Sequence, residues 1–564
     1  MHSRKILTLV FLIVLTLLSI RSFFSSGFFP MHDDAQVARV IVMAHALKNG
    51  QFPVRMVSDL GYGYGYPIFN FYGPLPYYVG GVLHVIGIDA LTATKIMIGL
   101  GMLIGSLSMY FCSSFIFGTL GGIFSTILFT FFPYRAVQVY VRGAIGEMWA
   151  VSLLPLVLFG LVRLIQENSK TKGMLISIMA LSAVILSHTV LGYVATGSIM
   201  VVACVLFVFS TIGKRNDLRH MSLSFFSVGL LSLGVTAFFW LPAIVDMPYT
   251  NVYKVIGKTA EYTDHYICIS QLWDSLWGFG GSAPGCLDGM SFKLGKLHIL
   301  SVIVSLGLWL STKMHGKRMY SFMGVLFISL VTLVFLTLQI SQPVWDRIPF
   351  SSFIQYPWRL LGPIGVCIAL IGGYLFYKKN SMLAYILLFV FGGSIIFFNL
   401  KLFSPQYLYS KPAESFENFE ELRFRASQVS DEYLPKDIKI PENPNQVISE
   451  RVTGSEFIHV KKIRETEIYG IYEITSIGTQ SLKLNMAYYP GWTYRINNQK
   501  MEPEVVQGEP SVILSSGANL LEMRFSDTIE MKIGNGISFI ALWVIIILMI
   551  YGKKIIRYYR HTRL

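Results

Sequence analysis

The chain has 564 residues, of which 53% are apolar and only 14% are charged, and its mean hydropathy is +0.55. This composition, with its long uninterrupted apolar runs, excludes an ordinary soluble domain and predicts a polytopic α-helical membrane protein. The net charge of +14 does not indicate a nucleic-acid partner, because many basic residues gather in short clusters between the apolar runs.

Apolar runs without Asp, Glu, Lys or Arg define the predicted membrane spans. Two runs, 96–134 and 173–213, are about twice the length that a helix needs to cross roughly 30 Å of hydrocarbon. Each is therefore expected to fold back as a helical hairpin, with turns near Phe117 and Gly118 and near His188. The first run is kept as an anchor, because more spans and no small-residue cleavage site follow it. About twelve spans are predicted in all, and the other runs are 6–20, 220–245, 319–345, 360–377, 380–400 and 533–552.

The positions of the basic residues predict which loops face the cytoplasm. Lys and Arg cluster at 4–5, 163–172, 214–219, 313–318, 378–379 and 553–563. By the positive-inside rule these clusters and both chain ends are cytoplasmic, in a plasma (inner) membrane. The connecting stretches 25–92, 134–148, 246–296, 341–359 and 401–532 are then extracytoplasmic.

Composition also predicts the division into domains. A transmembrane module is expected at 1–400, with an outer catalytic loop at 25–92 in which the apolar stretch 72–88 lies at the outer interface. Alternating runs such as EIYGIYEITS and SLKLNMAYY predict a β-rich extracytoplasmic domain at 401–532. The last transmembrane helix and a basic cytoplasmic tail follow at 533–564. No P-loop, Rossmann glycine pattern or zinc-ligand spacing is visible, so ATP-driven transport has no support within the chain.

Carboxylates at the outer ends of spans are the candidate catalytic residues. Asp33 and Asp34 follow the first span, and Glu147 stands at the mouth of the fourth. The acidic pair is suited to supply a general base for an acceptor hydroxyl or amine, with Asp33 as the preferred base, or to bind a divalent cation (Mg²⁺ or Mn²⁺) that neutralises a phosphate leaving group. Asp34 or Glu147, the second acid, would then orient the acceptor or help to hold the cation. Any such metal site would involve Asp33 and Glu147. The alternatives are a helix N-cap role for Asp33 or Asp34 and an ion pair of Glu147 with Arg142 or Arg135.

Arginines in the predicted outer loops are informative, because the positive-inside rule depletes them there. A guanidinium group offers bidentate hydrogen bonds to phosphate oxygens, so several in one cavity would suit a lipid-phosphate headgroup. We assign this role to Arg359, Arg135 and Arg142, although any single one could instead be a surface anchor. The outer arginines are Arg39, Arg55, Arg135, Arg142, Arg347 and Arg359.

Four further residues are predicted to line the substrate cavity. His188 is the one ionisable side chain in its run, which favours a functional role; the alternative is a hydrogen-bonded histidine that holds the hairpin turn. Tyr64, Tyr66 and Tyr72 belong to a Gly/Tyr/Pro-rich stretch whose rings could stack on a sugar, or could form part of an interfacial aromatic belt.

Two of the five cysteines share one polar outer loop. Cys268 and Cys286 could form a disulfide if this loop faces an oxidising compartment. Cys112, Cys204 and Cys367 lie in apolar runs, where they are expected to be inert packing residues.

The order of these motifs resembles a known family. An acid after the first span, a turn with Gly50, Pro53 and Arg55, and the stretch GYGYPIFNFYGPLPYY resemble the bacterial membrane proteins labelled "6-pyruvoyl-tetrahydropterin synthase-related". These proteins look like members of the GT-C superfamily of integral-membrane glycosyltransferases. Further matching motifs, spread over nearly the whole chain, are RGAIGEMWAVSLLPL, the LSH turn, QYPWRLLG and YYPGWTYRINNQ.

The resemblance implies a GT-C-like fold, a polyprenyl-phosphate-linked sugar donor, and inverting transfer on the extracytoplasmic face to a glycan, lipid or protein acceptor. The family's first-loop carboxylate maps onto Asp33, with Asp34 adjacent, and its second-loop acid maps onto Glu147. The oligosaccharyltransferase branch holds a divalent metal with several acids, and a comparable set is not found in this sequence. Soluble pterin chemistry, which needs a zinc-binding histidine set, has no support.

Two other function classes compete with the enzyme. A transporter or flippase for lipid-linked sugars would carry ionisable groups through the membrane depth, whereas here they cluster at the outer rim. A non-catalytic envelope-assembly scaffold would use the outer domain to bind envelope polymers. If Asp33 and Glu147 open into one cavity, the enzyme is favoured; acids on separate surfaces would favour the scaffold.

Overall fold

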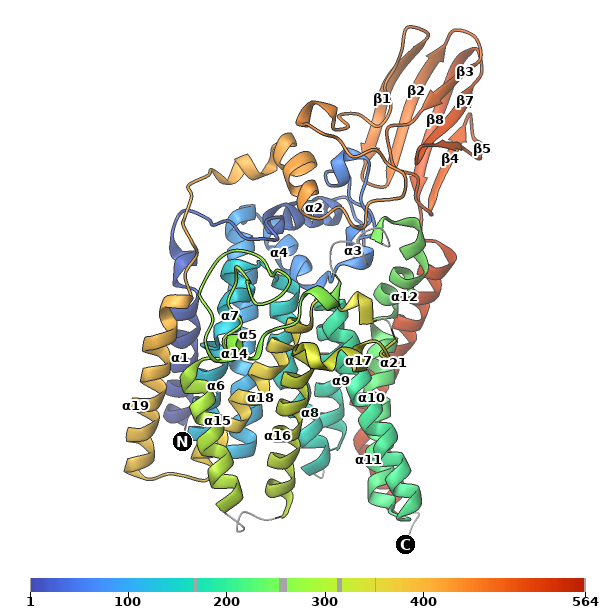
Figure 1. Ribbon diagram of the computed structural model, residues 1–564. Helices are drawn as coiled ribbons and strands as arrows, with labels where there is room; N and C mark the ends of the chain where they lie inside the picture. The colour runs from blue at the N-terminus through green and yellow to red at the C-terminus, as the bar shows by residue number, and fades with distance from the viewer. Residues whose placement is uncertain (1, 167–169, 253–260, 312–316, 350, 562–564) are drawn as a thin grey trace.

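The computed structural model describes residues 2–166, 170–252, 261–311, 317–349 and 351–561. A bundle of long helices forms the body of the molecule, a layer of short helices and loops covers one end of it, and a β domain projects beyond that layer (Figure 1). α1 begins, and α21 ends, toward the opposite end of the bundle. The predicted class, a polytopic helical protein with a C-terminal β-rich domain, is confirmed.

The bundle contains helices that suit a membrane. Within the described ranges, eight helices are long and apolar enough to cross a bilayer, or nine if the bent pair Thr119–Thr130 and Pro133–Val141 is one span, and three shorter apolar helices accompany them. The predicted number of about twelve spans stays a prediction. The helices are α1 (His2–Ser19), α5 (Ala90–Phe117), α6 (Thr119–Thr130), α8 (Ile145–Gln166), α9 (Lys170–Ser187), α10 (Thr189–Ile212), α11 (Asn216–Val235), α12 (Ala237–Asp246), α15 (Lys296–Ser311), α16 (Lys317–Thr337), α18 (Leu361–Gly373), α19 (Met382–Asn399) and α21 (Ile529–His561).

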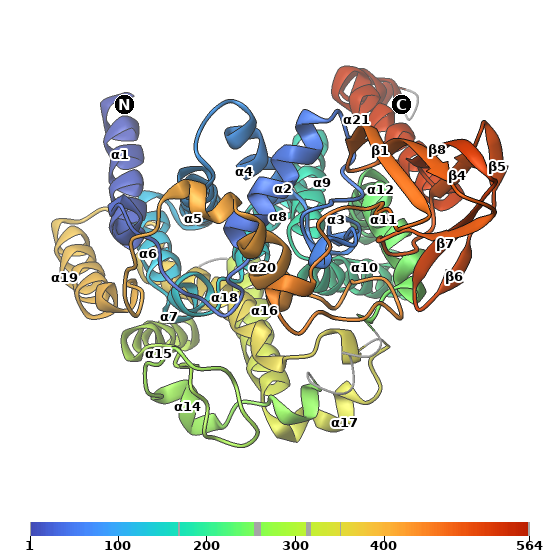
Figure 2. The ribbon, with the colours of Figure 1, turned by 90° about the horizontal axis from the view of Figure 1, so that it is seen from above.

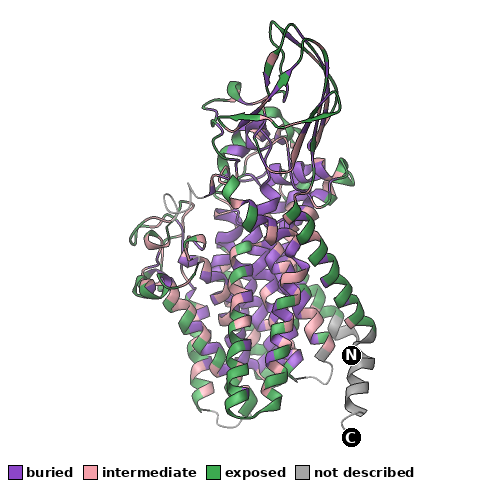
Figure 3. Ribbon diagram, turned by 90° about the vertical axis from the view of Figure 1, so that its right-hand side faces the viewer, coloured by how far each residue is buried: buried purple, intermediate pink, exposed green. Residues whose placement is uncertain are grey.

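The outward faces of the bundle carry apolar side chains that a soluble protein would bury. Exposed residues follow the outer surface of the helices, while the interior is buried (Figure 3). Side chains this large and this exposed match contact with lipid rather than water. Examples are Leu7 (71% exposed), Val201 (63%), Ile328 (69%) and Phe389 (82%).

Both predicted hairpins form. α5 ends at Phe117 and α6 begins at Thr119, joined through Gly118, whose φ of +88° favours glycine. α9 ends at Ser187 and α10 begins at Thr189, with His188 as the turn. The length of the apolar runs therefore predicted these turns correctly.

The layer at the end of the bundle comes from several parts of the chain. Gly80 and Gly81 of α4 pack directly on Val40 and Met43 of α2. α2 begins at Gln36 with Ala35 in the N-cap position and no side-chain cap, so the interpretation of Asp33 or Asp34 as a helix cap is wrong. The short helices are α2 (Gln36–Lys48), α3 (Ile68–Phe71), α4 (Leu75–Val85), α7 (Pro133–Ala136), α14 (Ile269–Trp273), α17 (Gln342–Trp345) and α20 (Ala426–Val429).

The β domain consists of two antiparallel sheets. One has the order β1-β2-β8-β4-β5 and the other β3-β7-β6, and alternate residues of both sheets share one buried core. The stretch 403–457 contains short helical turns and loops instead of strands. The strands are β1 (Ile458–Thr466), β2 (Tyr469–Ser476), β3 (Gln480–Lys483), β4 (Trp492–Ile496), β5 (Gln499–Met501), β6 (Glu504–Val506), β7 (Glu509–Leu514) and β8 (Gly517–Phe525).

Seen from above, the β domain lies to one side, over α21, α12 and α11 (Figure 2). Buried Arg55 holds this corner together, since its guanidinium group donates to the Phe238 carbonyl oxygen (2.8 Å) and to the side-chain oxygens of Asn535 (3.0 Å) and Asn70 (3.1 Å). Arg55 thus joins α12, α21 and α3 beside the β domain.

Candidate active site

A cavity of about 990 Å³ lies where the helical bundle meets the layer of short helices and loops at its end. Separate stretches of the chain line it: the loop before α2, the link between α3 and α4, the start of α8, the α9–α10 turn, the approach to α18, and the segment after α20. Among the lining residues are Asp33, Arg39, Tyr72, Arg142, Glu147, His188, Trp358, Arg359, Glu432 and Tyr433. Asp33 and Glu147 therefore open into one cavity.

Backbone hydrogen bonds hold Asp33 beside the segment that leads into α8. The Asp33 N–H donates to the Arg142 carbonyl oxygen (2.9 Å), and the His32 N–H donates to that of Val141 (3.0 Å). The Gln36 amide nitrogen bridges Asp33 Oδ2 (2.9 Å) and the Gly143 carbonyl oxygen (2.8 Å). These bonds join two loops that lie more than one hundred residues apart in sequence.

One oxygen of the Asp33 carboxylate is fully occupied. Oδ2 accepts hydrogen bonds from Arg39 (2.7 Å), Tyr72 (2.9 Å) and Gln36. Burial and the neighbouring Asp33 charge raise the pKa of Tyr72 well above its ordinary value, so its hydroxyl remains a donor. No donor in the described ranges contacts Oδ1, and the side chain is 25% exposed. The carboxylate is thus fixed in orientation and presents one oxygen to the cavity.

Glu147, in contrast, accepts hydrogen bonds at both of its carboxylate oxygens. Its side chain is fully buried; Oε1 accepts from Tyr134 (2.6 Å) and Gln138 (2.9 Å), and Oε2 accepts from Arg142 (2.7 Å). Arg359 Nε lies 3.9 Å from Oε2. The ion pair of Glu147 with Arg142 is present as one of the two sequence alternatives. A carboxylate with this many partners anchors guanidinium groups rather than removing a proton from a substrate.

Arg142 and Arg359 form a cationic pair supported by aromatic rings. The guanidinium carbon of Arg142 lies 4.3 Å from the Trp358 ring centre, and that of Arg359 lies 4.8 Å from the Tyr356 ring centre. The two rings stack on each other at 4.8 Å. Arg359 also donates to the Ile354 carbonyl oxygen (2.7 Å). Two guanidinium groups share the single Glu147 carboxylate, so this part of the cavity has an excess of positive charge.

The group around Asp33 has an excess of acidic side chains. Here Arg39 faces two carboxylates, Asp33 and Glu432. Burial raises the pKa of Glu432, and the Asp33 charge adds to this effect. Tyr433, the next residue, stacks on Phe71 with ring centres 5.0 Å apart. The cavity therefore joins a cationic group and an acidic group.

His188 lines the cavity and also holds its turn, while its functional role stays a prediction. Its Nδ1 accepts the Leu191 N–H at the start of α10 (3.2 Å). An acceptor at Nδ1 leaves the proton on Nε2 as a donor. The backbone of this turn lies very close to two glycines, since a Cβ at Gly73 or Gly146 would stand 2.1 or 2.4 Å from the Ser187 carbonyl oxygen.

We expect Gly146→Ala to damage the site by forcing α8 away from the His188 turn. Overpacking of this kind costs about 1–3 kcal/mol, so the unfolding midpoint of the purified protein in detergent and the activity should both fall. Gly197→Ala is the matched control, because no atom would lie within 4 Å of its new Cβ. Equal stability of the two variants would contradict the close approach.

Four predicted site residues do not line the cavity. Arg135 is buried inside the bundle, donates to the Met148 carbonyl oxygen (3.2 Å) and packs on the Phe129 ring, so it cannot bind a phosphate in the cavity. The interpretation of Arg135 as a phosphate ligand, and its pairing with Glu147, are therefore wrong.

The other three face different neighbours. Tyr66 donates to the Ser430 carbonyl oxygen (2.8 Å), and the Tyr64 carbonyl oxygen accepts the Ala487 N–H (2.8 Å); both contact the C-terminal segments rather than the cavity. Asp34 is exposed and lies near Glu421 instead, because neighbouring side chains in this loop point in different directions. The predictions for these positions as cavity residues are corrected accordingly.

The sequence did not predict that an acidic and an aromatic side chain of the distant segment 429–433 line the cavity. Glu432 and Tyr433 lie about 400 residues after Asp33 in the chain, and no local pattern connects them to it. The sequence marks Arg39 as an outer arginine but does not predict that it pairs with Asp33. Its position six residues after Asp33, with α2 beginning between them, is the signal that was available.

The carboxylates do not form a metal site of the expected kind. Within the part of the chain that the structure describes, no group of three His, Cys, Asp or Glu side chains is arranged to hold a metal ion. Asp33 is bonded to Arg39 and Glu147 to Arg142. The proposed pair of Asp33 and Glu147 therefore does not fit a Mg²⁺ or Mn²⁺ ion, and we derive no step through one.

The disulfide that the sequence left open is present. Cys268 and Cys286 are bonded to each other, and the loop that they close contributes Gly281 and Ser282 to the cavity. The pairing therefore stabilises one wall of the candidate site.

Comparison with known proteins identifies the family. A family model described as "6-pyruvoyl-tetrahydropterin synthase related domain; membrane protein" matches residues 69–405, more than half of the chain. The chain belongs to this family. The match confirms the resemblance drawn from the motifs, and it includes Glu147, His188 and Arg359 of the cavity, whereas Asp33 lies before it.

One curated protein of similar sequence is an uncharacterized protein of Lactococcus lactis subsp. cremoris (strain MG1363). It is 24% identical over 252 residues, which cover 44% of this chain and 40% of the relative. The chain thus spans less than half the length of that relative.

Three solved structures are similar to this family member. They are the arabinofuranosyltransferase AftD from Mycobacteria (14% identity, TM-score 0.46, 72% of this chain and 27% of that chain), the Archaeoglobus fulgidus oligosaccharyltransferase in the apo form (13%, 0.46, 79% and 62%), and ArnT from Cupriavidus metallidurans bound to undecaprenyl phosphate (12%, 0.40, 69% and 63%).

Proposed function

We propose that this protein is a GT-C-type membrane glycosyltransferase that moves a sugar from a polyprenyl-phosphate-linked donor to an extracytoplasmic acceptor. The observation that carries the proposal is the cavity itself. It contains a carboxylate with one free oxygen, Asp33, and a pair of guanidinium groups, Arg142 and Arg359, that share a single counter-charge.

The donor phosphate is assigned to the cationic pair. Phosphate oxygens accept bidentate hydrogen bonds from guanidinium groups, and a phosphate would neutralise the excess charge beside Glu147. Apolar residues of α10 and α12, Val190 and Ile244, also line the cavity, and Ile244 is 61% exposed. This apolar edge provides a surface for the first isoprene units of the lipid.

In the proposed reaction, Asp33 Oδ1 takes the proton from an acceptor hydroxyl as its oxygen attacks the anomeric carbon. The bond between that carbon and the phosphate oxygen breaks, and its electron pair leaves with the lipid phosphate. Arg142 and Arg359 stabilise the charge that develops there. Attack from the face opposite to the leaving group inverts the anomeric configuration. Glu147 acts as a positioning residue through the two guanidinium groups.

We infer that the cavity faces the extracytoplasmic side of the plasma membrane. The cavity, the Cys268–Cys286 loop and the β domain belong to the same end of the bundle. Disulfides persist in oxidising compartments. The connections α10–α11 and α18–α19, which carry basic residues, lie at the other end and would be cytoplasmic, as would both chain ends.

The test is transfer of labelled sugars from a panel of polyprenyl-phosphate donors by the purified protein in lipid vesicles, together with hydrolysis of the donors without acceptor. Transfer or hydrolysis of at least one donor is expected. If the protein instead moves labelled lipid between the leaflets without breaking the glycosidic bond, it is a transporter. If it binds envelope polymers and does neither, it is a scaffold.

Removing one guanidinium group should weaken donor binding. We expect Arg359→Met to lower the affinity for a polyprenyl monophosphate by about 10- to 100-fold, the effect of losing hydrogen bonds to a charged group. Binding is measured by titration of the lipid into the protein in nanodiscs. Arg347→Met is the matched control, because Arg347 is exposed and lies outside the lining of the cavity. Equal affinity of the two variants would contradict the phosphate assignment.

A further inference from the structure

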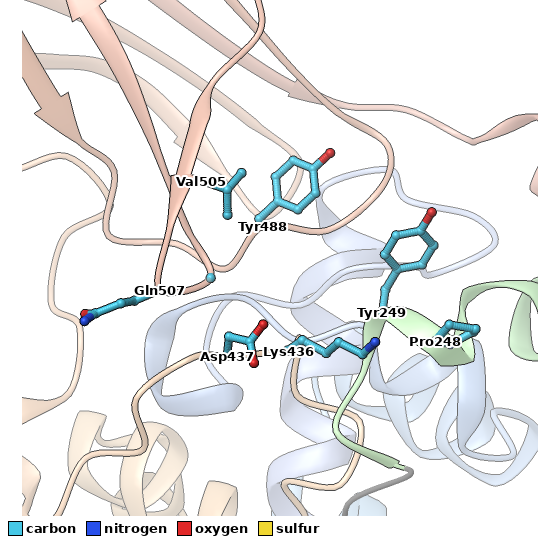
Figure 4. A pocket seen from close by; sticks show the side chains of 8 residues that line it. Pro248, Tyr249, Lys436, Asp437, Tyr488, Val505 and Gln507 are labelled. Carbon is cyan, nitrogen blue, oxygen red and sulfur yellow. The ribbon is translucent and has the colours of Figure 1, made fainter.

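A second cavity, of about 660 Å³, lies between the membrane module and the β domain. Three segments that are far apart in sequence supply its lining residues, and Tyr249, Lys436, Asp437 and Tyr488 lie around one space (Figure 4). Tyr249 follows α12, Lys436 and Asp437 belong to the segment before the β domain, and Tyr488 and Gln507 belong to the β domain. The candidate active site uses none of these five residues.

The same two segments line both cavities. After α12, Met247 and Val252 line the active-site cavity, whereas Tyr249 between them lines the second cavity. In the segment before the β domain, Tyr433 lines the first cavity and Lys436 lines the second. The two spaces are therefore neighbours on either side of a shared wall.

Backbone hydrogen bonds build that wall. The Asn251 N–H donates to the Leu434 carbonyl oxygen (2.9 Å), and the Lys436 N–H donates to the Tyr249 carbonyl oxygen (3.0 Å). The two segments form a short antiparallel pair, residues 249–251 against 434–436. The two cavities are therefore separated by only a few residues of each segment. A chain-like ligand bound in the active site would have to pass over this wall to reach the second cavity.

The second cavity has the chemistry of a saccharide site. Tyr249 is 45% exposed and Tyr488 is 39% exposed, so both rings are accessible. A pyranose ring has an apolar face of C–H groups, which packs on an aromatic ring, and an edge of hydroxyl groups, which need both donors and acceptors. Lys436 supplies donors and Asp437 supplies acceptors.

The second cavity is also preformed. The Tyr488 N–H donates to the Gly508 carbonyl oxygen (2.7 Å), and the next residue, buried Tyr489, donates to Asp246 Oδ2 (3.2 Å) at the end of α12. A Cβ on Gly508 would stand 2.5 Å from the Lys436 carbonyl oxygen, so the β6–β7 turn rests directly on the segment before the β domain. A rigid site of this kind binds with little loss of conformational entropy.

We propose that this second cavity binds a sugar residue of an acceptor glycan, at a distance from the sugar that receives the transferred unit. The inference rests on the proposed function, which it deepens by naming a glycan as the acceptor. It also gives a role to the first tyrosine of the YYPGWTYRINNQ motif, Tyr488, which the active site does not use.

The test is binding of the purified full chain, in nanodiscs, to an array of immobilised neutral oligosaccharides. Tyr488→Ala should weaken binding of the best glycan by about tenfold, as expected for loss of an aromatic anchor. Tyr488→Phe keeps the ring and should bind like the wild type. Tyr407→Ala is the matched control, because Tyr407 is exposed (56%) and outside both cavities.

Hydrolysis of the lipid-linked donor without acceptor is measured on the same samples. The glycan site is refuted, while the glycosyltransferase stands, if the donor is hydrolysed but no array glycan is bound. The same conclusion holds if the donor is hydrolysed and Tyr488→Ala binds the glycan as well as the wild type does. If glycan binding depends on the Tyr488 ring although no donor is hydrolysed or used, the glycan site stands and the proposed reaction is refuted.

Discussion

Asp33→Asn is expected to abolish sugar transfer in a protein that still folds and still binds a polyprenyl monophosphate. The amide has nearly the same shape and can still accept a hydrogen bond from Arg39 or Tyr72, but it cannot take a proton from the acceptor. Loss of a general base typically lowers the rate by about 10²- to 10⁴-fold. Transfer is measured with the donor panel in lipid vesicles, and lipid binding is measured in nanodiscs.

The neighbouring residue provides the matched control. Asp34→Asn changes the same charge one position away, but Asp34 is exposed and does not line the cavity. Its transfer rate should therefore be that of the wild type. Full activity of Asp33→Asn, or equal loss in both variants, would show that Asp33 is not the base.

Glu147→Gln is expected to destabilise the protein. The glutamine can still accept from Tyr134, but it leaves the Arg142 guanidinium group, 12% exposed, and that of Arg359 without a counter-charge. Breaking a buried ion pair from one side costs about 3–5 kcal/mol. The unfolding midpoint in detergent should fall by more than the midpoint of a variant that loses one partner of an exposed ion pair.

Glu473→Gln is the control for this variant, since Glu473 pairs with Lys461 on the exposed face of the β domain (3.0 Å), and such pairs contribute about 1 kcal/mol or less. Added polyprenyl monophosphate should restore part of the lost stability of Glu147→Gln, because its phosphate supplies a negative charge to the same guanidinium groups and binds the folded state. A variant as stable as the wild type would contradict the anchoring role of Glu147.

Local patterns predicted much of the architecture. The thickness of the hydrocarbon sets the length of a spanning helix, so two apolar runs of double length had to turn back, and they do so at Gly118 and His188. Strand alternation likewise predicted the β domain. The cost of placing a charge in a membrane directed attention to Asp33, Glu147 and Arg359, which line the cavity together.

The choice among similar candidates could not be made from the sequence. Arg135 and Arg142 are both near Glu147 in sequence, but the π-helical turn Val137–Val141 lies between them. Arg142 reaches the carboxylate, whereas Arg135 remains inside the bundle. Tyr72 reaches Asp33, whereas Tyr64 and Tyr66 do not line the cavity.

The sequence by itself determined the class of the protein, its helical hairpins, its β domain and the candidate acids at the ends of the spans. The tertiary structure decided which of these side chains meet, and it added Arg39 as the partner of Asp33 and Glu432 from a segment about 400 residues away. The reason is physical. Helix length, strand alternation and the cost of a buried charge act within one segment, whereas contacts between distant segments depend on how the whole bundle packs.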